Sequence, residues 1–240
     1  MATKKTAVVT GASSGIGLGL TTALIEHGYR VVANSRHITE SGALVPSENL
    51  ALVDGDIAKP ETARRIVEAA VQQFGSVDVL VNNAGIFIPK PFTEYTTDDF
   101  ERLVSTNLSG FLYVTQASVR HMKQQGAGHV VNITTTLADQ PVAGVPAAIP
   151  VLTKGGLNAV TAALAIEYAS DGIRFNAIGA GIIDTPMHKS ETHEFLKTLH
   201  PIQRIGKVSE IVDAVLYLTD ATFVTGEVLH VDGGAHAGKW

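Results

Sequence analysis

Short apolar runs alternate with longer amphipathic stretches along this chain of 240 residues. Seven runs have strand length and are rich in Val, Ile and Leu: 6–10, 30–35, 50–56, 77–85, 129–135, 173–178 and 227–231. Five stretches between them have the length and periodicity of helices: 15–27, 60–74, 97–124, 151–169 and 208–219. Apolar strands separated by helices form right-handed crossover units, in which helices bury both faces of a parallel sheet. The alternation therefore predicts an α/β fold built on a seven-stranded parallel sheet.

One segment does not follow this alternation. Residues 184–207 are rich in His and Thr and are interrupted by Pro186 and Pro201. Because they connect the last two predicted strands, we expect them at the carboxyl edge of the sheet, as a mobile substrate flap. A chain of this length that is 45% hydrophobic can bury one core. We predict a single domain over residues 1–240.

Charge and residue usage exclude several classes of function. The formal net charge is −5 and Lys and Arg are scattered, so we expect no nucleic-acid partner. The chain has no Cys and its His residues lack identifiable ligand partners, so we expect no metal site. The sequence shows no signal segment and no run of about 18 apolar residues. We expect a cytoplasmic protein that makes no membrane contact and acts on a small molecule.

A glycine-rich stretch, TGASSGIGLGL over residues 10–20, follows the first predicted strand and opens the first helix. Gly11 permits a sharp turn, Gly15 lets the backbone approach a pyrophosphate, and Gly17 lets the helix pack closely on the strand. The helix N-terminus then presents free N–H groups to the phosphates. This junction predicts a Rossmann-type, doubly wound sheet that binds a dinucleotide. The cofactor-binding residues of the turn are predicted to be Gly11, Ser13, Ser14, Gly15, Ile16 and Gly17.

Further polar residues follow later strands at the same edge of the sheet. Asp56 and Ile57 come after the third predicted strand, where a carboxylate can hydrogen-bond an adenine edge. Asn83, Ala84 and Gly85 come after the fourth. Because ligands of open parallel sheets bind beyond the carboxyl ends of the strands, we assign these residues to the cofactor site as well.

These motifs, taken in order, resemble the short-chain dehydrogenase/reductase family over almost the whole chain. The matching residues are Thr10–Gly17, Asn82–Gly85, Asn107, Val131–Ile133, Lys154, Asn176–Ala177, Thr225–Glu227 and Val231–Gly234. The resemblance implies a nicotinamide dinucleotide cofactor, with Lys154 on its ribose hydroxyls and Ile183 and Thr185 at its carboxamide. It also implies that Asn107 joins Lys154 in a catalytic ribose and water network, and that the protein is a homotetramer.

The end of the second predicted strand bears on the choice of cofactor. Chains that bind NAD place a carboxylate there for the ribose 2′-OH, whereas this chain has Ser35 followed by Arg36. A guanidinium and a hydroxyl suit a 2′-phosphate, to which Arg can donate two parallel hydrogen bonds. NADP(H) is therefore favoured. NAD(H) stays open, because Arg36 can be a solvated charge and Asn34 can serve an unmodified ribose.

The catalytic tyrosine of the family is absent. The family places it four residues before the lysine, on the same helix face, where the ammonium lowers the phenol pKa; here that position is Pro150. Proline carries no proton, but it is tolerated at the first position of the helix predicted at 151–169. The family's substrate-holding serine is matched by Thr135, which keeps a hydroxyl. The interval between Thr135 and Pro150 is two residues longer than is usual in the family.

Loss of a general acid typically costs ~10²–10⁴ in rate, so turnover is weakened and not forbidden. His188, in the predicted flap, is the candidate for a replacement donor, since histidine ordinarily titrates near neutrality; a surface histidine without a role is the alternative. We therefore expect an NADP(H)-dependent oxidoreductase that acts on a small carbonyl or alcohol. Two alternatives stay open: an NADP(H)-binding sensor or structural subunit without turnover, and a non-redox dehydratase or isomerase.

Overall fold

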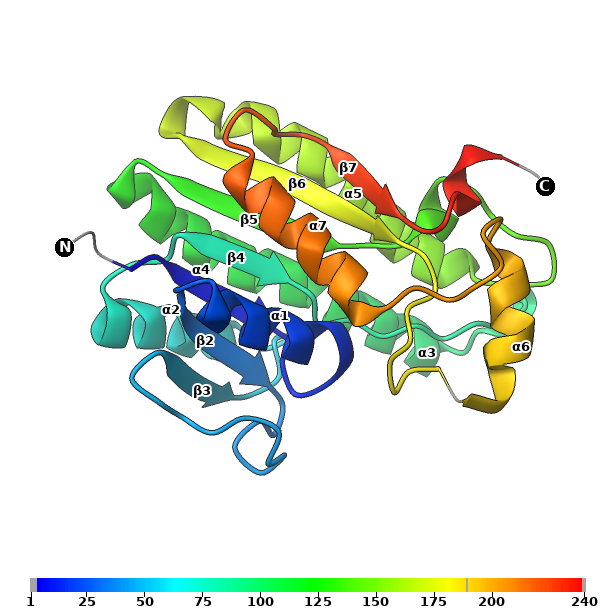
Figure 1. The fold of residues 1–240 in the computed structure, drawn as a ribbon, viewed down its shortest axis with the longest axis horizontal. Helices are drawn as coiled ribbons and strands as arrows, with labels where there is room; N and C mark the ends of the chain where they lie inside the picture. Colours follow the sequence, from blue (N-terminus) through cyan, green and yellow to red (C-terminus); the bar gives the residue numbers. More distant parts are fainter. Residues whose placement is uncertain (1–3, 189, 239–240) are drawn as a thin grey trace.

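A computed structural model describes residues 4–188 and 190–238 and contains one seven-stranded, fully parallel sheet (Figure 1). The strand order is β3-β2-β1-β4-β5-β6-β7. The strands are β1 (Thr6–Thr10), β2 (Arg30–Ser35), β3 (Leu50–Asp54), β4 (Val79–Asn82), β5 (Gly128–Ile133), β6 (Ile173–Ala180) and β7 (Val228–Val231). The order reverses between β1 and β4, which is the switch point of a doubly wound sheet. The predicted single-domain α/β fold of Rossmann type is confirmed.

Helices cover both faces of the sheet. They are α1 (Gly15–Glu26), α2 (Pro60–Phe74), α3 (Thr97–Val104), α4 (Gly110–Gln125), α5 (Ala148–Glu167), α6 (His193–Leu196) and α7 (Val208–Asp220). Helices α1 and α7 lie on one face, and α2, α4 and α5 lie on the other (Figure 1).

Strand β1 shows how the sheet supplies two cores. Ala7 and Val9 pack into the core beneath α1 and α7, and Val8 packs into the core beneath α2 and α4. All three side chains are fully buried, because successive residues of a strand point to opposite faces. A strand buried on both faces must be apolar at every position, and for this reason the strands appear in the sequence as continuous apolar runs.

The helix predicted at 97–124 is interrupted in the structure. Helix α3 ends at Val104 and α4 begins at Gly110, with a π-helical stretch, η2 (Ser105–Ser109), between them. A π-helical turn changes the hydrogen-bond spacing without ending the helix, so no loop separates α3 from α4. The sequence pattern therefore could not reveal the interruption.

The helix predicted at 151–169 begins earlier than expected. Helix α5 starts at Ala148, so Pro150 is its third residue and not its first. The position is still compatible with proline, because the first four N–H groups of a helix have no partner within the helix. The Pro150 carbonyl accepts a hydrogen bond from Thr153 Oγ1 at 3.0 Å.

The predicted flap at 184–207 is not devoid of structure. It contains η5 (Ser190–Thr192), α6 (His193–Leu196) and η6 (Lys197–Leu199), and it lies at the carboxyl edge of the sheet (Figure 1). These short turns are too brief to produce a helical period in the sequence. Whether the segment moves as a flap stays a prediction.

By length and composition alone, α5 is apolar enough to cross a membrane. In the structure its inner face packs on the sheet instead, with Thr153, Leu157 and Thr161 buried. Thr161 Oγ1 accepts a hydrogen bond at 2.9 Å from Asn132 of β5. Helix α5 is therefore a covering helix of the core, of the kind that also passes such a test.

A histidine is buried in the sheet itself. His129 on β5 is 3% exposed, and its Nε2 accepts a hydrogen bond at 3.1 Å from Asn176 on β6. Burial, reinforced by the nearby Arg174 charge, lowers the His129 pKa to about 3. The folded protein therefore holds this imidazole neutral down to acidic pH.

This neutral histidine makes the free energy of unfolding depend on pH. Between its ordinary pKa of 6.5 and about 3, the unfolded chain binds a proton that the folded chain excludes. Stability should thus fall with decreasing pH by at most ~1.4 kcal/mol per pH unit from this group. We expect His129→Gln to make urea-unfolding stability less steep between pH 6.5 and 4, since glutamine keeps an acceptor for Asn176 and does not titrate. The exposed His27→Gln is the control, and parallel curves for parent and His129→Gln would contradict the prediction.

Candidate functional site

A cavity of about 880 Å³ opens beyond the carboxyl ends of the strands. It is lined by the glycine-rich turn, by the ends of β2 and β3, by the loops after β4 and β5, and by the segment after β6. Every residue predicted above for the cofactor or the catalytic site lines it, except Gly17 and Asn107. These two lie behind the lining and position residues that form it.

Gly17 sets the distance between α1 and the turn. A Cβ atom at this position would lie 2.2 Å from the Gly11 carbonyl oxygen and 2.6 Å from Asn83 Nδ2. Gly11 itself has a φ of 68°, which side chains rarely tolerate. Thr10 Oγ1 accepts hydrogen bonds from the N–H groups of Asn83 and Ala84, each at 3.1 Å, and so ties the turn to the loop after β4.

The N-terminus of α1 is suited to an anion. Its N-cap residue, Ser14, makes no side-chain cap hydrogen bond, and the first turn contains no acidic residue. The N–H groups of this turn have no partner within the helix and carry the positive end of its dipole. Because Gly15 lies at the cavity wall, close to Thr185, the turn can approach a phosphate closely.

The end of β2 provides a polar edge. Asn34 is fully buried and donates hydrogen bonds from Nδ2 to the Val53 and Gly55 carbonyls at 2.9 and 3.1 Å. Its Oδ1, also buried, has no partner among the described residues, so it can accept a hydrogen bond from a ligand in the cavity. Ser35 and the exposed Arg36 follow it in the lining.

The carboxylate beside Ser35 in the sheet does not face this edge. Asp54 pairs with Ser35 in register but accepts hydrogen bonds from the Thr39 N–H and hydroxyl. The hydrogen bond from the Thr39 side chain, with that from its backbone, lowers the Asp54 pKa. Asp56 lines the cavity, and one of its oxygens is occupied by the Ala58 N–H at 2.9 Å.

The π-helical stretch places Asn107 between the loop after β4 and α5. Its Oδ1 accepts from the Ile86 N–H at 2.9 Å, and its Nδ2 donates to the Ile86 carbonyl at 3.0 Å and to Thr153 Oγ1 at 3.1 Å. The oxygen and the nitrogen of the Asn107 side-chain amide are thus both hydrogen-bonded within the protein. Asn107 is a positioning residue that holds the loop containing Gly85 against α5.

Lys154 reaches from α5 to the end of β5. Its Nζ donates to the Ile133 carbonyl at 2.7 Å, and it lies beside Gly85, where an added Cβ would be 2.9 Å from Nζ. No carboxylate is paired with it among the described residues, and burial lowers its pKa to about 8. The ammonium therefore predominates at neutral pH but loses its proton much more readily than an exposed lysine.

The position of the missing tyrosine contributes nothing to the cavity. Pro150 is buried and is absent from the lining. Thr135 lines the cavity, and its hydroxyl accepts only a long hydrogen bond of 3.3 Å from the Leu137 N–H. Its neighbours are committed elsewhere, since Thr134 donates to the Ile178 carbonyl and Thr136 donates to Asp232. Thr135 is therefore the threonine whose hydroxyl is available to a ligand.

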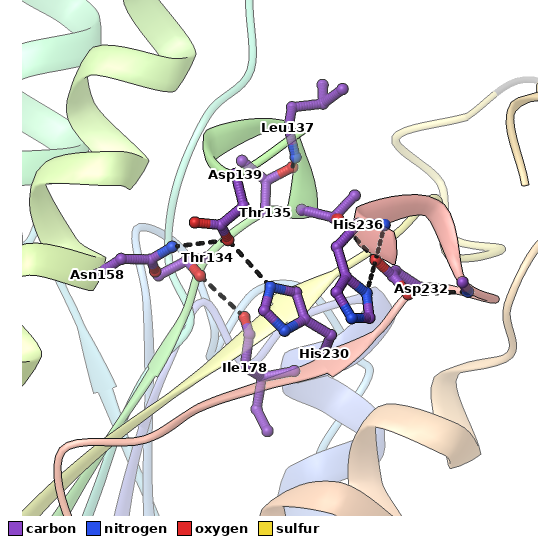
Figure 2. A network of polar contacts seen from close by, with 11 residues as sticks. Thr134, Thr135, Leu137, Asp139, Asn158, Ile178, His230, Asp232 and His236 are labelled. Atoms are coloured by element: carbon purple, nitrogen blue, oxygen red, sulfur yellow. Dashed lines mark hydrogen bonds and ion pairs between the residues drawn. The ribbon is translucent and has the colours of Figure 1, made fainter. Parts of the chain in front are cut away.

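A polar network holds the loop after Thr135 in place (Figure 2). Asp139 accepts hydrogen bonds from His230 Nε2 at 3.0 Å and from Asn158 Nδ2 at 3.4 Å. The His230 ring stacks on His236 at 3.9 Å between centroids, and His236 in turn binds Asp232. This network joins the loop to β7 and to the segment that follows it, so Asp139 is a structural residue and does not line the cavity.

His188 lines the cavity and lies on the segment after β6. Its backbone N–H donates to the Thr185 carbonyl at 2.9 Å. Burial lowers the His188 pKa, the nearby His193 lowers it further, and Asp184 opposes both. His188 shares the cavity with Thr135 and Lys154, so the structure brings the predicted catalytic side chains to one place.

Sequence reasoning predicted substrate contacts from the 136–149 loop and the 184–207 flap but named none of the apolar side chains of the lining. The missed side chains are Phe87, Leu137, Val142, Val145, Pro146, Met187, Phe195, Leu196 and Leu199. They lie on loops and short helical turns, where no strand or helix period marks them. The one available signal was the spacing of Phe195, Leu196 and Leu199, which fits one face of a helical turn.

Comparisons with known proteins agree with this geometry. A family model described as enoyl-(acyl carrier protein) reductase matches residues 11–236. The putative ketoacyl reductase 2 of the granaticin polyketide synthase, from Streptomyces violaceoruber, is 35% identical, and the match covers 96% of this chain and 95% of that protein.

Two solved structures have the same fold over almost their full length. The 3-ketoacyl-(acyl-carrier-protein) reductase of Brucella melitensis, complexed with NADH, has a TM-score of 0.90 and 32% identity, covering 98% of this chain and 100% of that one. A gluconate 5-dehydrogenase of Burkholderia cenocepacia, in complex with NADP and tartrate, has a TM-score of 0.89 and 29% identity, covering 98% and 96%. The glycine-rich turn, the retained lysine and these matches together show that the chain belongs to the short-chain dehydrogenase/reductase family of oxidoreductases.

Proposed function

We propose that this protein is an NADP(H)-dependent oxidoreductase that interconverts a small carbonyl compound and its alcohol without a phenolic proton donor. The observation that carries the proposal is the continuity of one cavity from the glycine-rich turn to Thr135, Lys154 and His188. A dinucleotide held at the turn would present its reactive end to these side chains. The absence of tyrosine favours a second candidate, a dinucleotide-binding protein without turnover; a non-redox dehydratase or isomerase is a third outcome of the tests below.

Several features of the cavity fit the phosphorylated cofactor. Asn34 Oδ1 is a buried acceptor that lacks a partner among the described residues, and a ribose hydroxyl is a suitable donor for it. Ser35 and Arg36 follow it at the cavity wall and suit a 2′-phosphate. Solved relatives with NADP and with NADH support NADP(H) as the favoured cofactor and NAD(H) as the alternative.

The protein's own groups would divide the work at the reacting carbon. The bound nicotinamide supplies or accepts the hydride. We assign the Thr135 hydroxyl to hold the substrate oxygen, Lys154 to bind the ribose hydroxyls, and Asn107 to position the loop beside them. Ile183 and Thr185 in the cavity wall are assigned to the carboxamide. His188 is the proposed proton donor, and Lys154, with its pKa of about 8, is the other protic cation in reach of the cavity.

Exposed apolar side chains on two helices support a homotetramer. Leu152 and Ile166 on α5 are 59% and 81% exposed, and Leu112 on α4 is 45% exposed. Leu152 and Ile166 are two heptads apart and lie on one helix face, together with Gly156, whose surroundings are open. Large apolar groups on a helix face of this kind are typical of a subunit contact.

We propose a cytoplasmic location, in line with the small-molecule chemistry.

The cofactor assignment predicts a selective effect of Arg36. Charge-assisted hydrogen bonds are worth about 1.5–3 kcal/mol, so Arg36→Ala should weaken NADPH binding roughly 10–100-fold and change NADH binding little. Fluorescence titration of both reduced cofactors gives the two dissociation constants. Arg64→Ala, an exposed change on α2 outside the cavity, serves as the control. Equal weakening of NADPH and NADH would rule out a 2′-phosphate contact.

The proton donor can be identified from the pH dependence of carbonyl reduction at saturating NADPH. Because the pKa of His188 is lowered, its imidazolium becomes abundant only below neutral pH, so the rate should rise as the pH falls. His188→Asn should abolish this rise and reduce kcat roughly 10²-fold or more, whereas His27→Asn on the surface should not. If the rate stays constant through neutral pH, falls only as the pH rises through about 8, and does so equally in His188→Asn, the proton donor is Lys154 and not His188.

The subunit contact is tested by light scattering. The parent should have four times the chain mass of 25.3 kDa. Leu152→Glu places an unpaired charge in the proposed contact and should dissociate the assembly. Val45→Glu, at another exposed apolar position, should not. A monomeric parent would contradict the proposal.

A further inference from the structure

The cavity has two chemically different ends. The end lined by the glycine-rich turn and by the ends of β2 and β3 is polar and contains Arg36 and Asp56. The other end is lined by parts of three segments, 86–89, 135–146 and 186–200, which we call the substrate side. Its large side chains are apolar except for two histidines, and Phe87, Leu137, Val145, Met187, Phe195 and Leu199 contribute most of the apolar surface. The contrast indicates that the substrate side is built for a different kind of ligand.

The charged residues near the substrate side are held away from it. Asp139, the only acid of the 135–146 loop, is bound by His230 and Asn158. Lys197 is paired with Glu194, and Lys90 is paired with Asp99 at 2.5 Å. Among the described residues, the cavity lining contains no Asp, Glu, Lys or Arg besides Arg36, Asp56 and Lys154.

Two apolar side chains on the substrate side are also unusually exposed. Met187 is 59% exposed and Phe195 is 58% exposed, although both line a cavity. Large apolar side chains left open to a cavity gain free energy when an apolar ligand covers them. The polar side chains of this surface are few: Thr136 donates to Asp232 and His200 Nε2 accepts from the Ile182 N–H, so Thr135 and His188 are the groups without a partner of this kind. They suffice for one carbonyl oxygen and not for several hydroxyls.

We infer that the substrate is an uncharged ketone, or the matching secondary alcohol, with a hydrocarbon body, and that it is neither a sugar nor a carboxylic acid. This inference rests on the proposed function. A carboxylate buried on the substrate side would find no Lys or Arg among the described residues that line it, and most hydroxyls of a sugar would lack a hydrogen-bond partner. The carbonyl oxygen would lie at Thr135, and the hydrocarbon body would contact the loop after β5 and α6.

A matched pair of ketones tests the inference. 2-Octanone and 7-oxooctanoate have the same carbon skeleton and differ only at the terminal carbon, which is a methyl group in one and a carboxylate in the other. With saturating NADPH we expect kcat/KM for 2-octanone to exceed that for 7-oxooctanoate at least 100-fold, and fructose to be reduced no better than the keto acid. Equal or better turnover of the keto acid or of fructose would overturn the inference.

A substitution on the substrate side tests whether this surface causes the preference for 2-octanone over 7-oxooctanoate. Phe195→Arg replaces an exposed side chain, so it should fold, and it gives a carboxylate the guanidinium that the substrate side lacks. We expect it to narrow the preference for 2-octanone over 7-oxooctanoate at least tenfold. Phe223→Arg, at a fully exposed phenylalanine outside the lining, should leave the preference unchanged. An unchanged preference in Phe195→Arg would overturn the assignment of this surface to the substrate.

The two proposals can fail separately. NADPH binding and binding of both ketones to the NADP⁺ complex are measured by ligand-observed NMR, which needs no turnover. Bound NADPH and bound 2-octanone without any reduction would overturn the oxidoreductase and leave the ligand preference standing. Turnover of the keto acid in preference to 2-octanone would overturn the apolar substrate and leave the oxidoreductase standing.

Discussion

The close approach of α1 to the turn after β1 is the constraint on which the site depends. A single added carbon at Gly17 would lie 2.2 Å from the Gly11 carbonyl oxygen, so the contact tolerates no side chain. The same contact aims the uncapped N-terminus of α1 at the cavity. It also brings the turn against the loop after β4, where the backbone N–H and the Nδ2 of Asn83 donate hydrogen bonds to Thr10. Displacement of α1 would therefore disturb the phosphate end of the cavity and, through Gly85, the surroundings of Lys154.

The buried ammonium of Lys154 lowers the stability of the folded chain. Its ammonium is buried with one carbonyl partner and no carboxylate among the described residues, and burial lowers its pKa to about 8. A buried cation without a counter-charge destabilises the folded chain, and removing the charge from such a site often stabilises a protein. The structure retains this unfavourable arrangement at the point where the cavity changes from polar to apolar. That is the expected signature of a functional residue, since a lysine without a role here would be replaced at no cost.

The sequence predicted the layers of the fold well because both faces of the sheet are buried. The helix over 60–74 and the strand over 6–10 have the observed bounds of α2 and β1. The π-helical stretch at 105–109 was missed because the chain stays helical through it, although it is what places Asn107. Helix α5 begins three residues before the predicted start at 151, because Pro150 indicates a helix N-terminus but the first turn also accepts proline at its third position. Helix α6 has four residues, too few for a period.

The candidate site was predictable to a different extent at its two ends. The dinucleotide end consists of glycines and polar residues at fixed offsets from strands, and each of these leaves a mark in the sequence. The substrate side consists of Val, Leu, Phe and Met on loops, and such residues look the same in a sequence whether they line a cavity or fill a core. Only the three-dimensional arrangement shows that Phe195 and Leu199 face the same space as Val145.

The loss of tyrosine and the apolar character of the substrate side have a common physical basis. Replacing a phenol by Pro150 removes a polar group from α5, and the longer loop before it contributes Val142, Val145 and Pro146 to the lining. Exclusion of water from such a surface strengthens any hydrogen bond that Thr135 makes to a carbonyl oxygen. Burial also lowers the pKa of Lys154 to about 8, where the ammonium both predominates at neutral pH and can release its proton.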